Sequence, residues 1–276
     1  MKTILLSLIA LAFSLGANAQ KQLVILHTND THSCVMPLNA NLADTAVAGR
    51  GGYLRRLALI EEERRQSPDL LLFDSGDFSQ GSPYYTLFKG IVEVGLMSRM
   101  QYDAATIGNH EFDYGLDNMA VVFSMARFPI VCANYDFRGT PVEPYVKPYV
   151  ILRRQGMRIG VFGLSPQLEG LVDMSKCQGV KYLDPFETAN RVAAELKHKE
   201  KCDLVICLSH LGWDEQGDIR LIRGSRDIDL VLGGHSHTYF EQLRNVENAD
   251  GRSIGVDQNG KSGIWIGRLV LDMKKR

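Results

Sequence analysis

Seven short apolar runs constrain the fold of this chain more than any other feature of its sequence. They cover residues 23–26, 70–73, 103–107, 129–133, 159–162, 204–208 and 230–232. They are largely continuous rather than alternating, which is typical of strands covered on both faces. Helix-like stretches lie between several of them, at residues 52–66, 83–100, 116–126 and 185–199. This alternation predicts an α/β domain whose sheets are covered by helices.

Two further segments indicate antiparallel pairing. Residues 149–158 have the pattern of a hairpin that leads into the next strand, and residues 254–273 have that of closing antiparallel strands around the turn Asn259-Gly260-Lys261. The sheets are therefore expected to be mixed. The sequence has no internal repeat, low-complexity segment or Pro/Ser-rich linker, so we expect one domain.

Composition excludes some classes of partner. The chain has 276 residues, 45% of them hydrophobic, which is enough for one large domain with a core of its own. Its formal net charge is -1, so no overall electrostatic attraction favours a nucleic acid polymer or an anionic membrane surface. An anionic ligand must therefore be bound by groups at its own site.

The first residues have the pattern of a secretory signal peptide. Lys2 precedes an apolar run at residues 4–15, and Ala17-Asn18-Ala19 precedes Gln20. We expect a signal peptide over residues 1–19, a mature domain over residues 20–276, and a secreted, periplasmic protein. The apolar run is too short to cross a membrane, and no other stretch is long and apolar enough.

Export would permit disulfides, but the cysteines do not indicate a framework. There are five, an odd number, and their spacing follows no disulfide pattern. Cys132 and Cys207 lie inside apolar runs and are expected to be small core residues. We predict no required disulfide.

Five polar clusters directly follow five of the apolar runs. They are HTNDTH at 27–32, DSGD at 74–77, GNHEFD at 108–113, SHLG at 209–212 and GGHSH at 233–237. Ligands bind outside the carboxyl ends of strands in open α/β sheets, so these clusters are expected to meet at one edge. Six of the seven histidines lie in them, and only His198 does not. Loops that merely satisfy their own backbone would not concentrate histidine in this way.

The residue types in these clusters favour a metal site. Imidazole nitrogen and carboxylate oxygen are ligands of Zn, Mn and Fe, and the scarcity of cysteine argues against a structural zinc site. Asp30 and His32 are two residues apart, as are His235 and His237, so each pair can point to one side of an extended segment. The turn after Gly233 also allows the last two histidines to reach different ions. There are enough ligand groups for two ions.

The order of the motifs resembles a known family. D-x-H, G-D, G-N-H-E, a lone histidine after a strand, and G-H-x-H follow one another as in the calcineurin-like binuclear metallophosphoesterases. The segments LHTNDTHS, GNHEFDYG and GGHSH are similar to those of the catalytic domain of secreted bacterial 5'-nucleotidases and UDP-sugar hydrolases. The resemblance runs from about Leu23 to the end. It implies a four-layer α/β/β/α sandwich, in which two mixed sheets pack face to face with helices outside, as a single domain.

The resemblance also implies a binuclear centre of two divalent ions, whether Mn, Zn or Fe. One ion would be held by Asp30, His32, Asp77 and His237. The other would be held by Asn109, His210, His235 and the same Asp77, whose carboxylate would bridge the two.

Two neighbouring residues are expected to meet the substrate, namely Asn109 and the catalytic His110. Asp113 would accept a hydrogen bond from the other ring nitrogen of His110 and favour the imidazolium. The alternative for Asp113 is the N-cap of the helix near residue 116, and Glu111 is expected to be a surface turn residue. His27 is expected to be a hydrogen-bonded core histidine rather than a ligand.

The function implied is that of a phosphoesterase in which a metal-activated water attacks phosphorus. The expected substrate is a small phosphomonoester, above all a nucleoside 5'-monophosphate, with phosphodiester or nucleotide-sugar pyrophosphate cleavage as the alternative. The chain ends where the second, substrate-binding domain of the secreted 5'-nucleotidases would begin. Three hypotheses therefore remain open: a free-standing phosphatase, a catalytic subunit that needs a separately encoded substrate-binding polypeptide, and a non-catalytic binding protein.

Overall fold

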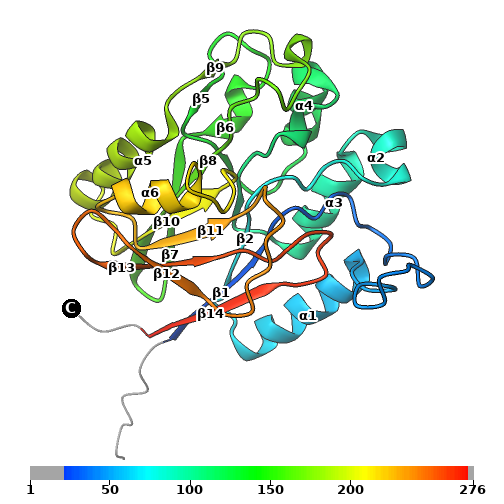
Figure 1. Ribbon diagram of the computed structural model, residues 1–276, viewed down its shortest axis with the longest axis horizontal. Coiled ribbons are helices and arrows are strands. Elements are labelled where there is room, and N and C mark those ends of the chain that lie inside the picture. Colours follow the sequence, from blue (N-terminus) through cyan, green and yellow to red (C-terminus); the bar gives the residue numbers. More distant parts are fainter. Residues whose placement is uncertain (1–21, 273–276) are drawn as a thin grey trace, which may run out of the picture.

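The computed structural model describes residues 22–272, so the expected signal peptide at 1–19 lies outside the described residues. Within them, the chain forms two six-stranded sheets and one two-stranded sheet (Figure 1). The first large sheet has the strand order β14 (Gly267–Asp272), β1 (Gln22–Thr28), β2 (Leu71–Asp74), β3 (Ala104–Ala105), β4 (Ile130–Val131) and β6 (Val146–Lys147). The second has the order β12 (Arg244–Glu247), β13 (Ser253–Asp257), β11 (Leu230–Gly233), β10 (Leu204–Ser209), β8 (Met157–Leu164) and β7 (Tyr149–Arg154). The small sheet pairs β5 (Tyr135–Asp136) with β9 (Lys181–Tyr182).

Both large sheets are mixed, as predicted. In the first, β1, β2, β3, β4 and β6 are parallel, and β14 adds an antiparallel strand to the edge at β1. In the second, β8, β10, β11 and β13 are parallel, while β7 and β12 are antiparallel edge strands. Figure 1 shows β1 and β14, from opposite ends of the chain, side by side. The predicted hairpin at 149–158 is the pair β7 and β8.

Helices cover the outer face of each sheet (Figure 1). On the first sheet lie α1 (Tyr53–Gln66), α3 (Ile91–Met100) and α4 (Gly115–Ser124), which supply buried apolar residues to the core beneath them. On the second lie α5 (Pro185–Ala194) and α6 (Asp218–Gly224). The short α2 (Pro83–Phe88) precedes α3, and a five-residue π-helical segment, Glu195–Lys199, continues α5.

The core has three parts, one under each helix layer and one between the two sheets. In β1, Leu23 and Ile25 point into the core between the sheets, while Val24 and Leu26 point toward the helices. A strand buried on both faces has no polar side, which accounts for the continuous apolar runs. The layers are thus helix, sheet, sheet and helix, and the predicted α/β/β/α sandwich is confirmed.

Two expectations about the elements were wrong. The helix predicted over 83–100 is interrupted where Lys89 and Gly90 both have positive φ, at 53° and 100°. The strands predicted over 254–273 do not pair with each other, because β13 pairs with β11 and β12 whereas β14 pairs with β1. The segment between them, residues 258–266, passes from the second sheet to the first, and its path brings it to the site described below. The short α6 and β12 were not predicted.

The expected place of Cys132 and Cys207 in the core is confirmed. All five cysteines are buried and free, including Cys132 and Cys207 in the core. None of the helices among residues 22–272 has the length and apolar character needed to cross a membrane.

Gly163 of β8 packs closely against Val131 of β4 in the other sheet, and this gives a test of the packing. A Cβ at this position would lie 2.1 Å from the carbonyl oxygen of Val131 and 2.2 Å from Oγ1 of Thr106. We expect Gly163→Ala to lower the free energy of unfolding by at least about 2 kcal/mol, because the backbones of β8 and β4 cannot move apart without separating the two sheets.

The matched control is Gly95→Ala in α3, where an added Cβ meets nothing within 4 Å. This second variant should be more stable by about 0.5–1 kcal/mol, since alanine is the better helix former. Urea denaturation of both variants measures the difference. Equal effects in the two would contradict the packing described.

Candidate metal centre

The five polar clusters lie together at the carboxyl ends of strands. This was expected because each of them directly follows an apolar run in the sequence. Three of them follow β1, β2 and β3 of the first sheet, and two follow β10 and β11 of the second. The site is therefore assembled across the edge where both sheets end. Three groups of histidine and carboxylate side chains meet there within metal-binding distance of one another.

The first group consists of Asp30, His32 and His237. The Nε2 atoms of His32 and His237 are 2.9 Å apart. Oδ1 of Asp30 lies 3.8 Å from Nε2 of His32 and 3.5 Å from Nε2 of His237. Three lone-pair donors thus converge on one point, where a cation would satisfy all of them.

The second group consists of Asp77, His210 and His235. Nδ1 of His210 donates to the carbonyl oxygen of Ser75 at 2.6 Å, which leaves Nε2 to face Oδ2 of Asp77 at 3.2 Å. His210 is fully buried, and its ring centroid lies 5.1 Å from that of His235. A histidine held through Nδ1 by a backbone carbonyl is oriented as metal-binding histidines are.

The two groups are in contact. The backbone N–H of His235 donates to Oδ2 of Asp30 at 2.9 Å, and Asp30 Oδ1 lies 3.9 Å from Nε2 of His210. A third group, formed by His32, Asp77 and His110, joins them. Six of the seven side chains expected to hold two ions, all but Asn109, are thus brought together in two adjacent groups.

Unpartnered polar atoms at this edge fit bound cations. Nε2 of His210, Nδ1 of His32 and Oδ1 of Asn109 are buried and have no hydrogen-bond partner among the described residues. Such atoms are rare in folded proteins because leaving them unpaired costs about 1–3 kcal/mol each. A divalent cation beside His210 and Asn109 would supply the missing partner.

The charges at the site also fit cations. Burial alone would lower the pKa of His210, but the Asp77 carboxylate, 3.2 Å from Nε2, and Asp30 outweigh burial and raise the pKa to about 10. Burial raises the pKa of Asp77 and the neighbouring His210 opposes it, so that the net pKa of Asp77 lies below its usual range. The buried carboxylates therefore require positive charge, which a proton on His210 or a metal ion can provide.

The backbone is strained at five of the expected ligands. Their φ angles are positive: 48° at Asp30, 42° at His32, 54° at Asp77, 71° at His235 and 54° at His237. A non-glycine residue in this region costs of order 1–3 kcal/mol, and such residues cluster at functional sites. At these positions the backbone changes direction shortly after each strand ends, so that the side chains face the metal centre.

Glycines beside the ligands leave room for this arrangement. A Cβ on Gly108 would lie 2.1 Å from Oδ1 of Asp77, and one on Gly234 would lie 2.9 Å from Nδ1 of His210. The glycines of the GNHE and GGHSH motifs are thus required by close packing against ligand side chains.

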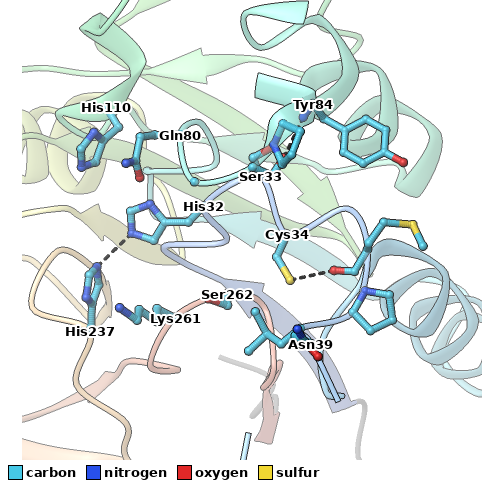
Figure 2. A pocket seen from close by; sticks show the side chains of 16 residues that line it. His32, Ser33, Cys34, Asn39, Gln80, Tyr84, His110, His237, Lys261 and Ser262 are labelled. Atoms are coloured by element: carbon cyan, nitrogen blue, oxygen red, sulfur yellow. Dashed lines mark hydrogen bonds between the residues drawn. The ribbon is translucent and has the colours of Figure 1, made fainter. Parts of the chain in front are cut away.

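His110 stands beside the two groups, in the 3₁₀ turn η1 (His110–Phe112) that follows β3. Figure 2 shows its ring next to that of His32, with His237 on the other side of His32, at the wall of a cleft. Nδ1 of His110 lies 3.1 Å from Oδ2 of Asp113, and the hydrogen bond with this carboxylate raises the pKa of His110. Asp113 does not cap the next helix, because the N-cap of α4 is Tyr114.

Glu111 is buried, so the expectation of a surface turn residue was wrong. Its carboxylate accepts hydrogen bonds from the backbone N–H groups of Asp77 at 3.1 Å, Ser79 at 3.1 Å and Gly108 at 2.6 Å. It therefore ties the loop that carries Asp77 to the GNHE turn. Its place next to His110 in the motif could have suggested an inward role, but a single acidic residue in a turn carries no periodicity to reveal its direction.

His27, by contrast, is the core histidine that was expected. It is fully buried, and its Nε2 lies 2.9 Å from Oδ2 of Asp257. It takes no part in the three groups at the metal centre.

The class of protein that this fold and site define is confirmed by comparison with known proteins. Residues 23–239 match the calcineurin-like phosphoesterase family, and the chain belongs to that family. Metal-dependent phosphoric ester hydrolases of this family use two divalent metal ions, in agreement with the groups of ligands described above.

The individual relatives include nucleotidases and a cyclic-nucleotide phosphodiesterase. The chain is 31% identical over 98% of its length to a 5'-nucleotidase of Diplobatis ommata, and 30% identical over 98% to a 2',3'-cyclic-nucleotide 2'-phosphodiesterase/3'-nucleotidase of Haemophilus influenzae. It covers 49% and 45% of these two relatives, so it spans about half of their length. The crystal structure of a 5'-nucleotidase precursor from Thermus thermophilus superimposes with a TM-score of 0.84 at 30% identity, over 92% of this chain and 52% of that one.

Glu111 gives a test of how the site is held together. In Glu111→Gln a single amide oxygen replaces two carboxylate oxygens that accept three backbone N–H groups. We expect the free energy of unfolding to fall by about 1–3 kcal/mol. The affinity for Mn²⁺ should fall by about 10- to 100-fold, because the loop that carries Asp77 is no longer fixed.

The control is Glu241→Gln, the same change on an exposed side chain outside the five polar clusters. Urea denaturation and calorimetric titration with Mn²⁺ measure the two effects. Wild-type metal affinity in Glu111→Gln would mean that the carboxylate does not position Asp77.

Proposed function

We propose that this chain is a two-metal phosphoesterase that hydrolyses phosphomonoesters, nucleoside 5'-monophosphates first among them. The observation that carries the proposal is that two groups of ligands and the His110–Asp113 pair lie at one edge of the fold. The proposed ligands of one ion are Asp30, His32, Asp77 and His237. Those of the other are Asn109, His210, His235 and the shared Asp77.

When bound, two divalent cations would polarise a phosphoryl oxygen and activate a water molecule for attack on phosphorus. The protein holds the ligand side chains in place before any substrate arrives. His210 is oriented by Ser75 and Asp30 by the backbone of His235, so the site needs little reorganisation. Such preorganisation is the larger part of what a protein contributes to phosphoryl transfer.

His110 is proposed to act on the substrate directly, together with Asn109. Asp113 raises the pKa of His110, so that the ring is available as an imidazolium. A protonated ring that faces the cleft would stabilise the charge on the phosphoryl oxygens and give a proton to the leaving oxygen. Asp113 would hold the ring in the orientation that this transfer needs. No covalent intermediate with the protein is required.

A phosphodiester is the second candidate substrate. One of the relatives above is named as both a cyclic-nucleotide phosphodiesterase and a nucleotidase, at 30% identity over 98% of this chain. The same metal centre would attack either ester, and hydrolysis of a nucleotide-sugar pyrophosphate follows the same chemistry.

The setting of the activity is also a proposal. The pattern at residues 1–19 supports export to the periplasm. We propose in addition that a separately encoded polypeptide supplies further contacts to the substrate. Such a partner would raise the activity and the selectivity of the chain without changing its metal centre.

The role of His110 can be tested by substitution. We expect His110→Ala to lower kcat for AMP by about 10²- to 10⁴-fold, the usual contribution of a general acid or base. Asp113→Asn should cause a smaller loss. His198→Ala, which changes an exposed histidine outside the clusters, is the control.

The assay compares AMP, UDP-glucose, a 2',3'-cyclic nucleotide and bis-p-nitrophenyl phosphate with the metal-stripped chain reloaded with Mn²⁺ or Zn²⁺. A kcat for AMP in His110→Ala close to that of the wild type would contradict the proposed role. Preference for the cyclic nucleotide over AMP would favour the second candidate.

The shared role of Asp77 can be tested by counting metal ions. The wild-type chain should bind about two divalent ions, and Asp77→Asn should bind clearly fewer, because one carboxylate is proposed to serve both ions. Asp69→Asn, which changes an exposed carboxylate, is the control. Elemental analysis after dialysis gives the number per chain. Two ions bound by Asp77→Asn with wild-type affinity would rule out the shared ligand.

A further inference from the structure

Residues 258–262 pass beside the metal centre on their way from the second sheet to the first, and we call them the crossing segment. They follow β13 at its carboxyl end, where the ligand loops also lie, and the chain then continues to β14. Figure 2 shows Lys261 of the crossing segment beside His237, with Ser262 next to it. The sequence predicts only a turn here, at residues 259–261. Hydrogen bonds join the crossing segment to the ligand loops of both sheets.

Gln258 binds the loop of residues 234–238, which carries two of the proposed ligands. Its side chain is fully buried. Its Nε2 donates to the carbonyl oxygen of Gly234 at 2.8 Å, and its Oε1 accepts from Oγ of Ser236 at 2.9 Å and from the backbone N–H of Thr238 at 2.5 Å. These three partners alternate along the loop with the two histidines of the GGHSH motif. Every hydrogen bond that this amide makes within residues 22–272 therefore goes to the ligand loop.

The loop requires both ends of the amide. The backbone carbonyl of Gly234 can only accept a hydrogen bond, whereas the backbone N–H of Thr238 can only donate one. A carboxylate would lack the donor, and an apolar side chain of the same length would lack both groups. The amide of Gln258 supplies both, and these two partners set its orientation.

The loop depends on such contacts because its backbone is strained. Its two histidines have positive φ angles, 71° at His235 and 54° at His237. Residues in this region keep their conformation only where the surrounding structure outweighs the strain. The amide of Gln258 supplies three hydrogen bonds, one at each of the three positions that flank the histidines. Without them, both histidines would be freer to move.

The crossing segment is also fixed to the ligand loop of the first sheet. Asn29 is buried, its Nδ2 donates to the carbonyl oxygen of Gly260 at 2.8 Å, and its Oδ1 accepts from the backbone N–H of Asn259 at 2.9 Å. The same Nδ2 donates to Oδ2 of Asp30 at 2.6 Å. The backbone N–H of Ser262 donates to the carbonyl oxygen of Asp30 at 2.7 Å. A continuous path of hydrogen bonds thus runs from Asp30 through the crossing segment to the histidine loop.

Each group of ligands combines residues of the two sheets, so the spacing of the ligands depends on this path. In the first group Asp30 and His32 follow β1, whereas His237 follows β11. In the second group Asp77 follows β2, whereas His235 again follows β11. One loop of the second sheet therefore gives a histidine to each group. A shift of that loop would disturb both groups at once.

We propose that Gln258 is a positioning residue for both metal ions. It is not itself a proposed ligand, and it acts by holding His235 and His237 at the distance from the first sheet that two ions require. The assignment of these two histidines to different ions rests on the proposed function, whereas the contacts of Gln258 do not. Glu111 holds Asp77 from the side of the first sheet, and Gln258 holds the opposing ligands from the side of the second.

A matched amide separates positioning from stability. Asn248 is also buried, and its side chain also makes three hydrogen bonds: it donates to the carbonyl oxygen of Arg226 at 3.1 Å and accepts from the N–H groups of Asp250 at 3.0 Å and Arg252 at 2.9 Å. It precedes β13, whereas Gln258 follows it, so the two amides lie at opposite ends of this strand. Gln258→Met and Asn248→Leu remove these amides with little change in side-chain size. Both should lower the urea midpoint of the metal-free chain.

Calorimetric titration with Mn²⁺ distinguishes the two variants. We expect Gln258→Met to weaken the binding of both ions by about 10- to 100-fold, as is usual when a residue that orients metal ligands is lost. Asn248→Leu should bind both ions with wild-type affinity. Wild-type affinity in Gln258→Met, an equal loss in Asn248→Leu, or a loss confined to one ion would overturn the proposal.

Ser236→Ala is a milder second variant, because Ser236 is exposed and supplies one of the three partners of Gln258. It should weaken the binding of both ions by about 2- to 10-fold, which is the usual contribution of one hydrogen bond. If Gln258→Met fails to fold, wild-type affinity in Ser236→Ala overturns the proposal.

Hydrolysis of AMP and bis-p-nitrophenyl phosphate by the Mn²⁺-loaded wild-type chain tests the proposed function separately. Hydrolysis together with unchanged Mn²⁺ binding in Gln258→Met refutes the positioning role and leaves the proposed function standing. Weaker Mn²⁺ binding in Gln258→Met, in a chain that hydrolyses neither ester, supports the positioning role and refutes the proposed function.

Discussion

The burial of Asp77 is the constraint on which the rest of the site depends. Its side chain is 3% exposed, and an isolated carboxylate at that depth would be strongly unfavourable. It is compensated by Nε2 of His210 at 3.2 Å and by the backbone N–H of His110 at 2.9 Å. Glu111, a second buried carboxylate, accepts the N–H of Asp77 itself. Burial raises the pKa of Glu111 to about 7, so Asp77 carries the charge that requires a cation. The same requirement explains why histidines from both sheets gather around it.

The fold places the Asp77 carboxylate where the strands of both sheets end. Strands buried on both faces supply a rigid frame, and the chain must then turn sharply at their carboxyl ends. Positive φ angles at Asp30, Asp77 and His235 show that these turns are strained. The three-part apolar core offsets that cost, since each fully buried aliphatic or aromatic side chain contributes about 1.5–3 kcal/mol. The packed layers thus stabilise the fold and offset the strain at the ends of their strands, as is common for active sites.

Much of this could be predicted from the sequence, for identifiable reasons. All seven apolar runs became strands, because a strand covered on both faces has no polar side and is recognisable without alternation. The gathering of the polar clusters followed from the rule that parallel strands end at one edge. The assignment of individual ligands, such as Asn109, came from resemblance to a family and not from the residues alone.

Other features depend on tertiary contacts that no local pattern encodes. The direction of Glu111 is set by three N–H groups, two from the distant loop that carries Asp77 and one from its own turn. The separation of β13 from β14 depends on the free edge of β1, at the other end of the chain, which β14 occupies. In both cases the deciding partner lies far away in the sequence. The break between α2 and α3 differs, because Gly90, with a φ of 100°, is a local signal for it.

The central claim is that two metal ions share one ligand at this edge, and electron paramagnetic resonance of the chain during titration with Mn²⁺ tests it most directly. Two manganese ions bridged by Asp77 would be about 3.5–4 Å apart and magnetically coupled. The account predicts that the signal of a coupled pair grows as the second equivalent binds. A spectrum of isolated manganese that saturates at one equivalent, or two uncoupled ions at two equivalents, would contradict it.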